Sequence, residues 1–324
     1  MNVGHSSKPP RRRDFLLQTV GTTAASAISF ATGCAPAEPE QPVIDVHIHT
    51  NFEDEVARRQ AQTLSRVDFS PAGLLAEMAE NDVEQAVTIG FETNGGQLSR
   101  EADNPFAPFI PPDPRSAAKL LPVGGINPNR LDSAGLERIE RQLSAGRVKG
   151  LKIYLGYYPV SPDAGVYRPV YELAAKYSTP VIFHTGDTSS ADAKIRYAHP
   201  LPIDDVAVDY HGVTFVVAHL GNPWTMDAAE LLYKNPNVYA DLSGFLVGDA
   251  AYFEDPNNAQ GIEDAAGRIR EAFAWVEDPR KFLYGSDWPL VPMKPYLNFI
   301  RRAVDPEHYE QVFYSNAKRI FQIE

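Results

Sequence analysis

The sequence predicts a TIM-type (β/α)8 barrel with long loops after its strands, on three observations. Strand-like and helix-like segments alternate eight times from Val43 onward. Most strand-like segments are continuous apolar runs, as expected of a parallel sheet covered on both faces. The segments that leave the strands are long and those that enter them are short, which is typical of a barrel with a working mouth at the carboxyl ends of its strands. A doubly wound open sheet is the competing fold, but it gives the eighth strand no particular role.

The predicted elements follow one another from residue 43 to residue 324 without a second domain. Short turns precede most strands, as at Asn81-Asp82 and Ala145-Gly146. The predicted strands are 43–49, 84–91, 121–127, 148–155, 180–184, 213–219, 237–243 and 281–287. The predicted helices include 71–80, 131–144, 168–177, 203–210, 226–233 and 264–276.

The amino terminus reads as a targeting segment rather than as part of the barrel. Residues 11–17, Arg-Arg-Arg-Asp-Phe-Leu-Leu, resemble a twin-arginine export signal. The apolar run 19–31 is too short and too polar to span a bilayer. It ends at Ala-Thr-Gly-Cys, which resembles a lipoprotein processing box with Cys34 as the lipidated residue. We therefore expect a signal peptide at 1–33, a Pro-rich tether at 34–42, and an exported protein in the periplasm or at the cell surface that is anchored to a membrane by lipid.

Charge and cysteine content restrict the partners and ligands. The net charge is −12, and removing residues 1–33, which carry four basic residues and one acidic residue, makes it −15. So acidic a chain argues against nucleic acid and against a basic membrane-binding patch, and favours a small-molecule substrate. Cys34 is the only cysteine, so neither an intrachain disulfide nor a thiolate metal ligand is expected. No feature of the sequence specifies an oligomeric state.

Four histidines and an aspartate end predicted strands, and together they predict a metalloenzyme. Side chains alternate along a strand, so His47 and His49 face the same side. The carboxyl ends of the strands of a barrel meet at one mouth, which would bring His184, His219 and Asp287 to that pair. A single histidine at the end of an apolar strand is often a hydrogen-bonded core residue, but the whole set points to a site.

The same segments resemble the amidohydrolase superfamily, and most of all its amidohydrolase-related branch of hydrolases, lactonases and decarboxylases. The resemblance rests on motifs that occur in family order and mostly end predicted strands. They are Val-Ile-Asp-Val-His-Ile-His from residue 43, Phe-His-Thr-Gly from 183, Ala-His-Leu-Gly from 218, Tyr-Gly-Ser-Asp-Trp-Pro from 284 and Asn-Ala-Lys-Arg-Ile-Phe from 316.

The resemblance implies a ligand set and roles for these residues. His47, His49, His184 and Asp287 would hold a divalent cation, with Zn²⁺ the first choice and Mn²⁺, Fe²⁺ or Ni²⁺ compatible with the ligand types. Asp287 would also act as general base. His219 would polarise the substrate carbonyl or bind a second metal ion.

Lys152 in Lys-Gly-Leu-Lys-Ile-Tyr has two interpretations. In binuclear members of the superfamily a lysine in a similar context is carboxylated and bridges two metal ions, whereas the amidohydrolase-related branch more often uses one ion. Without carboxylation, Lys152 would contact a substrate carboxylate or pair with Asp287.

Other polar and aromatic residues are weaker candidates. Tyr154, Asp187, His199 and Trp288 follow strand ends and are predicted to contact substrate or shape its cavity, although ordinary packing and surface exposure explain such residues as well. Asp241, at the end of the seventh strand, would orient substrate or hold the barrel mouth together.

Three functions are compatible with this pattern. The first is a metal-dependent hydrolase in which activated water attacks an amide, lactone or ester carbonyl of a small molecule. The alternative is a metal-dependent decarboxylase of a small aromatic or unsaturated acid. The third is a non-enzymatic metal-binding lipoprotein, against which the full set of histidines and aspartate and the long loops count.

Overall fold

The structure is a computed structural model that describes residues 41–94 and 97–323. The export signal, Cys34 and most of the tether lie outside the described residues. What the sequence predicts about export, lipidation and the domain boundaries therefore stays a prediction.

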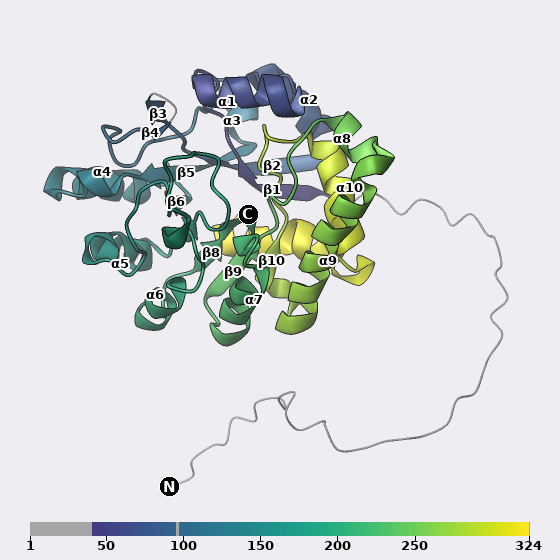
Figure 1. The fold of residues 1–324 in the computed structure, drawn as a ribbon. Coiled ribbons are helices and arrows are strands. Elements are labelled where there is room, and N and C mark those ends of the chain that lie inside the picture. Colours follow the sequence, from purple (N-terminus) through teal and green to yellow (C-terminus); the bar gives the residue numbers. More distant parts are fainter. Residues whose placement is uncertain (1–40, 95–96, 324) are drawn as a thin grey trace, which may run out of the picture. The chain divides into compact units, whose positions relative to one another are not determined.

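Eight parallel strands form one sheet in the order β1-β2-β5-β6-β7-β8-β9-β10. Backbone hydrogen bonds join β1 to the segment after β10 and close the sheet into a barrel. Val46 N–H donates to Tyr284 O at 3.0 Å, and His49 N–H donates to Trp288 O at 2.8 Å. In Figure 1 the strands lie at the centre and helices surround them. The predicted (β/α)8 barrel is confirmed.

All eight predicted strands are present, most of them shorter than predicted. The barrel strands are β1 (Val43–Ile48), β2 (Val83–Ile89), β5 (Leu120–Ile126), β6 (Gly150–Ile153), β7 (Val181–Phe183), β8 (Phe215–Val217), β9 (Val238–Asp241) and β10 (Phe282–Leu283). A small antiparallel hairpin, β3 (Thr93–Asn94) and β4 (Gln97–Leu98), lies in the long segment after β2.

The helices between the strands follow the sequence pattern closely. They are α2 (Pro71–Glu80), α4 (Ser133–Ser144), α5 (Arg168–Tyr177), α6 (Ile203–Asp209), α7 (Thr225–Lys234) and α9 (Ala259–Val276). Two of them, α2 and α5, have the predicted bounds. The start of α2 is fixed by Pro71 and by Ser70, whose hydroxyl accepts a hydrogen bond from Gly73 N–H at 3.0 Å.

Further helices lie in segments for which no helix is predicted. They are α1 (Glu55–Gln60), α3 (Pro114–Ala117), α8 (Ala250–Glu254), α10 (Met293–Ala303) and α11 (Asn316–Phe321). Asp54 explains the start of α1, because its carboxylate accepts hydrogen bonds from Val56 N–H and Ala57 N–H. The segment after β1 is therefore partly ordered by helix rather than being one open loop.

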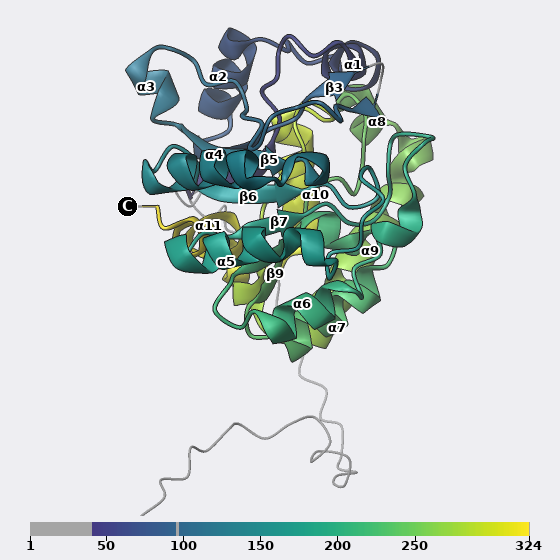
Figure 2. The same ribbon diagram turned by 90° about the vertical axis from the view of Figure 1, so that its left-hand side faces the viewer.

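Two apolar clusters lie on opposite faces of the barrel sheet. Leu151 and Phe183 belong to a larger cluster that includes helix residues such as Ile139 of α4, so it packs between sheet and helices. Ile182 and Val216, which alternate with these, belong to a smaller cluster on the inner face. Figure 2 shows α4, α5 and α6 covering the outer face near β6 and β7.

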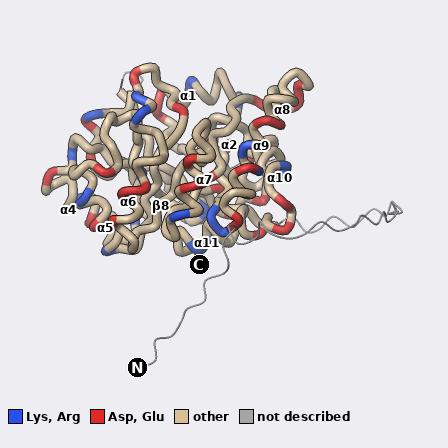
Figure 3. Tube along the Cα trace, turned by 60° about the horizontal axis from the view of Figure 1, so that its bottom comes forward, with Lys and Arg blue, Asp and Glu red and all other residues tan. Residues whose placement is uncertain are grey.

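Charged residues lie on the outer helices, with acidic and basic positions interspersed along the chain (Figure 3). For example, α6 carries Asp204, Asp205 and Asp209, and Lys234 of the neighbouring α7 pairs with Asp204. In the described part of the chain, no helix is both long enough and apolar enough to cross a bilayer.

Candidate metal centre

Five strands bring six polar side chains to one small cavity at their carboxyl ends, which we call the inner cavity. It has a volume of about 70 Å³. These side chains are His47 and His49 at the end of β1, Lys152 in β6, His184 after β7, His219 after β8 and Asp287 after β10. Residues that are distant in sequence thus meet as the barrel prediction requires.

His47, His49 and Asp287 form the tightest group. One ligand atom from each lies within 4.8 Å of the other two. Asp287 Oδ1 is 3.3 Å from His49 Nε2 and 3.7 Å from His47 Nε2. Burial raises the pKa of Asp287, but a hydrogen bond from His49 and the positive charge that His47, His49 and His219 would carry when protonated lower it by more, so the pKa lies well below its usual range and the carboxylate is ionised.

Hydrogen bonds on the far side of each ring decide which nitrogen carries the proton. His49 Nδ1 lies 3.2 Å from the Ile89 carbonyl, which can only accept, so Nδ1 is the donor. His47 Nδ1 donates to Asp241 Oδ2 at 2.9 Å, and burial lowers the pKa of His47 to about 4. In their neutral forms, both rings therefore present an Nε2 lone pair to the Asp287 carboxylate.

His184 is oriented by the same kind of contact. Its Nε2 donates to the Asp187 carbonyl at 2.9 Å. Burial and the neighbouring His219 lower its pKa well below the usual value, so the ring is neutral and Nδ1 keeps its lone pair. The His184 ring lies 5.1 Å from that of His219, but its ligand atoms fall outside the 4.8 Å group of His47, His49 and Asp287.

Asp241 at the end of β9 anchors two of the histidines. Its Oδ2 accepts from His47, and its Oδ1 accepts from His219 N–H at 2.9 Å and from the Ser243 hydroxyl at 2.5 Å. The Ser243 oxygen in turn lies 2.9 Å from His219 Nδ1. Because the serine hydrogen points to Asp241, Ser243 accepts from His219 Nδ1–H, and His219 Nε2 carries the lone pair. Although Asp241 is also close enough to His47 and His219 to bind an ion with them, its oxygens are already engaged as acceptors.

Lys152 is the cation of the inner cavity. It is completely buried, on the opposite strand face from Leu151 and Ile153, and its Nζ has no hydrogen-bond partner in the described structure. Burial lowers its pKa to about 8, against the opposing influence of Asp241 and Asp287. A buried amine without a partner leaves room for a ligand atom that the chain itself does not supply.

Two of the site residues adopt strained backbone conformations. His219 has φ 61° and Asp287 has φ 67°, in the left-handed region that non-glycine residues seldom occupy. Each such residue costs on the order of 1–3 kcal/mol and persists only where its surroundings impose it. This backbone conformation orients both side chains toward the inner cavity, whose lining includes them.

These features fit a divalent cation. Two imidazole lone pairs and a carboxylate oxygen converge within 4.8 Å, an arrangement of acceptor facing acceptor that a positive charge between them would stabilise. The hydrogen bonds behind His47, His49 and His184 are those that orient metal-binding histidines. His47, His49 and Asp287 would hold the ion, with His184 beside them.

Comparison with known proteins places the chain in a family. Residues 44–323 match the family model described as amidohydrolase. The chain belongs to the amidohydrolase family. The match covers nearly all of the described barrel, so the family resemblance predicted from the five sequence motifs is confirmed. A search of curated proteins gave no significant match.

Solved structures with the same fold include enzymes of two reaction types. An uncharacterised TIM-barrel protein from Bordetella bronchiseptica is 19% identical with a TM-score of 0.61, covering 87% of this chain and 99% of its own. The 5-carboxyvanillate decarboxylase of Sphingomonas paucimobilis is 16% identical with a TM-score of 0.58 and the same coverage. A probable 2-pyrone-4,6-dicarboxylic acid hydrolase from Acinetobacter baumannii, with citric acid bound, is 14% identical with a TM-score of 0.57, covering 87% and 100%. At these identities the likeness shows the TIM-type barrel fold alone.

The four candidate substrate-contacting residues of this amidohydrolase-family chain lie in different places. Tyr154 is buried and lines the inner cavity, and its hydroxyl donates to the Gly90 carbonyl. Asp187 is exposed and reaches the site only through its backbone carbonyl. His199 packs on Trp224 with ring centroids 4.8 Å apart, outside the cavity lining.

Trp288 supports the site from behind rather than lining it. It is fully buried, its indole N–H donates to Glu77 at 3.2 Å, and its ring packs against Phe52 and Phe69. Asp45 is likewise structural: its Oδ1 accepts from His47 N–H and Ser286 N–H, both at 3.0 Å, and so ties β1 to the segment after β10.

The sequence analysis missed Ser243 and the way Asp241 acts. The only signal in the sequence was the Asp-Leu-Ser pattern at the end of β9, whose period of two puts both polar side chains on the face that bears the histidines.

Proposed function

We propose that this chain is a metal-dependent enzyme that decarboxylates a small aromatic or unsaturated acid. The observation that carries the proposal is Lys152, a buried amine without a hydrogen-bond partner among the described residues, in the same cavity as the converging histidines and Asp287. A substrate carboxylate would supply the missing partner. The sequence analysis put hydrolysis first, but the barrels of similar fold include several decarboxylases, among them two structures of 2,6-dihydroxybenzoate decarboxylase.

Of the residues around the inner cavity, Lys152 would bind the substrate carboxylate, and Asp287 or His219 would transfer a proton. A bound divalent cation supplies a Lewis-acid centre for a carboxylate or for water. Lys152, with its pKa lowered to about 8, would pair with one carboxylate oxygen of the substrate. The bond from the carboxyl group to its neighbouring carbon then breaks, and CO₂ leaves. The proton that replaces it would come from water by way of Asp287 or His219, which would first accept it there.

The decisive experiment measures CO₂ release from a panel of aromatic and unsaturated acids, with metal content determined in the same samples. Asp287→Asn should lower turnover by about 10²-fold or more. Asparagine tolerates the left-handed backbone at this position, so the variant should fold. Asp227→Asn on the exposed face of α7 is the matched control and should retain full activity. Full activity of Asp287→Asn with metal in place would contradict the proposal.

Hydrolysis of an amide, lactone or ester is the second candidate. The inner cavity has room for a few water molecules beside Asp287, which could accept a proton from one of them. The fold shared with a probable pyrone dicarboxylate hydrolase favours the same chemistry. Hydrolysis of lactones or esters with no CO₂ released from any acid in the panel would favour this candidate over decarboxylation.

For the metal we propose one or two divalent ions, with zinc and manganese the first to test. Nitrogen and carboxylate ligands suit both. A 5-carboxyvanillate decarboxylase from Novosphingobium aromaticivorans, 12% identical with a TM-score of 0.55, was crystallised with manganese. Elemental analysis of protein grown in media that supply each ion would decide. An unchanged ion count in Lys152→Ala would exclude a carboxylated lysine bridge.

Export and lipid anchoring are proposed from the amino-terminal motifs alone. Cys34→Ala should move the protein from the membrane fraction to the soluble fraction after cell breakage, because a lipid anchor there would be lost. An unchanged distribution would contradict anchoring at Cys34.

A further inference from the structure

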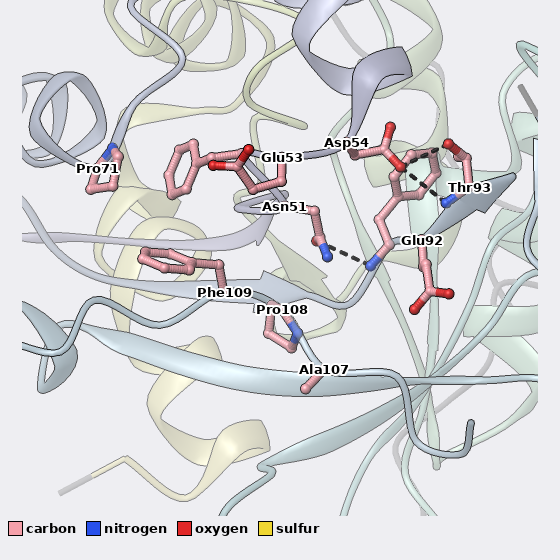
Figure 4. A pocket seen from close by; sticks show the side chains of 11 residues that line it. Asn51, Glu53, Asp54, Pro71, Glu92, Thr93, Ala107, Pro108 and Phe109 are labelled. Carbon is pink, nitrogen blue, oxygen red and sulfur yellow. Dashed lines mark hydrogen bonds between the residues drawn. The ribbon is translucent and has the colours of Figure 1, made fainter. Parts of the chain in front are cut away.

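A second and larger pocket lies beside the inner cavity, between the segments that follow β1 and β2. It has a volume of about 490 Å³ and we call it the outer pocket. Figure 4 shows Phe109, Pro108 and Ala107 on one side and Asn51 and Glu53 on the other. Phe52, Asp54, Pro71, Phe91, Glu92 and Thr93 complete its lining.

The outer pocket adjoins the metal centre through shared walls. Phe91 lines both cavities, and its ring lies 5.4 Å from the imidazole of His49. Thr50, next to His49, donates to the Phe109 carbonyl at 2.7 Å, and Asn51 accepts from Phe91 N–H at 3.1 Å. Two walls of the outer pocket are therefore fastened to the end of β1.

The sizes of the two cavities assign different parts of a substrate to each. At about 70 Å³ the inner cavity takes a few atoms around a reacting group, whereas pockets that enclose small ligands are usually about 300–1,000 Å³. The outer pocket, at about 490 Å³, falls in that range. A substrate larger than its reacting group can extend past Phe91, which lines both cavities.

The lining of the outer pocket is apolar rings with carboxylates at the edge, and it contains no Lys or Arg. Asp54 is engaged by Val56 N–H, Ala57 N–H and Thr93, and Glu53 pairs with Arg58 at 3.2 Å. The exposed Glu92 side chain has no hydrogen bond or ion pair within the described ranges, so its charge is available to a ligand. An anion here would meet uncompensated negative charge, whereas a cation would meet Glu92 and the faces of Phe91 and Phe109.

Resting on the proposed function, we infer that the outer pocket holds the non-reacting part of the substrate and selects a flat apolar group that is cationic or neutral rather than anionic. A substrate with a second carboxylate at its far end would be disfavoured. The outer pocket, rather than the metal centre, would then set the substrate class.

Direct binding of three simple probes tests this without turnover. Benzylamine, benzyl alcohol and benzoate share one ring and differ in charge, and ligand-observed NMR gives their dissociation constants with the full chain. In chelator-treated Lys152→Met protein, where the inner cavity offers a carboxylate neither an ion nor an amine, benzylamine should bind most tightly. Phe109→Ser should weaken binding of benzylamine and benzyl alcohol by about fivefold, because the ring loses a stacking wall. Tyr233→Ser, which removes an exposed aromatic side chain on α7, should leave both unchanged.

Glu92→Gln separates charge from shape. It should weaken benzylamine by about threefold and leave benzyl alcohol unchanged. Glu271→Gln on α9 alters the net charge equally and should change the affinity of neither probe. Both glutamates are exposed, so the variants should fold. In the same Lys152→Met background, benzoate that binds as tightly as benzylamine would overturn the inference, and so would probe affinities that Phe109→Ser does not change.

The result is independent of catalysis. An inactive or metal-free chain that still selects benzylamine would leave the inference standing and overturn only the proposed function. An active decarboxylase whose affinity for benzylamine is unchanged by Glu92→Gln would overturn the inference and leave the proposed function standing.

Discussion

Ser243 lies between the Asp241 carboxylate and the imidazoles of His219 and His47. Its hydroxyl donates to Asp241 and accepts from His219. Its oxygen is 2.5 Å from Asp241 Oδ1, 2.9 Å from His219 Nδ1 and 3.1 Å from His47 Nδ1. A single hydroxyl therefore decides which nitrogen of His219 carries the proton and which has the lone pair.

Ser243→Ala should release His219 from its single protonation pattern. Nitrogen NMR of ¹⁵N-histidine-labelled protein should show the Nδ1–H form in the wild type and a mixture of both forms in the variant. Activity or metal affinity should fall by about tenfold, a typical effect for a residue that orients a metal-site histidine. Ser243→Thr keeps the hydroxyl and should restore both signals. An unchanged NMR spectrum in Ser243→Ala would rule out this role.

The candidate residues that meet in the inner cavity come from the ends of barrel strands. His47 lies in β1, and His184, His219 and Asp287 follow β7, β8 and β10 within four residues. His199, by contrast, lies in a loop, and no periodicity tells where a loop side chain points. The position of a residue at a strand end follows from alternation along the strand, whereas the position of a loop residue depends on its tertiary contacts.

Among the elements, the turn between α7 and β9 depends on one lysine. Lys281, just before β10, is nearly buried, and its Nζ donates to the carbonyls of Asn235, Pro236 and Val238 at 2.8, 2.9 and 3.0 Å. It thus joins the amino-terminal ends of two neighbouring strands, on the face of the barrel away from the metal centre.

Lys281→Met should destabilise the barrel by roughly 2–4 kcal/mol, because it leaves three carbonyls without their donor while keeping the side-chain volume. Urea unfolding followed by circular dichroism measures the change. Lys234→Met is the control: its ion pair with Asp204 is partly exposed, so the loss should stay within about 1 kcal/mol. Equal effects of the two substitutions would show that the three carbonyls find other donors.

Helices were predicted where amphipathic periodicity and clear stops coincide, as in α2 and α5. The helix α10 (Met293–Ala303) was not predicted, although its apolar residues Tyr296, Leu297 and Ile300 recur at helical spacing. The short helices α1 and α8 depend on their capping aspartates and on packing over the barrel mouth, which periodicity does not reveal.

For the whole molecule, metal binding and stability should be linked. An ion bound by residues from both β1 and the segment after β10 ties the two ends of the barrel sheet together. At an ion concentration 100 times the dissociation constant, binding adds about 2.7 kcal/mol to the free energy of unfolding.

Chelation should therefore lower the Tm by roughly 5 °C for a barrel of this size. Differential scanning calorimetry with and without EDTA, followed by restoration of zinc or manganese, measures this. Asp287→Asn should show little response to either treatment. A wild-type Tm unaffected by chelation would count against an ion at this position.

The sequence by itself determined the barrel, its eight strands and the strand ends that carry the candidate metal ligands. Alternation along a strand and the common direction of parallel strands are local rules that fix which face and which end a residue occupies. Only the tertiary structure decided the protonation patterns of the histidines, the role of Ser243, and the division into inner cavity and outer pocket. Those depend on distances between loops from different strands, which no local pattern encodes.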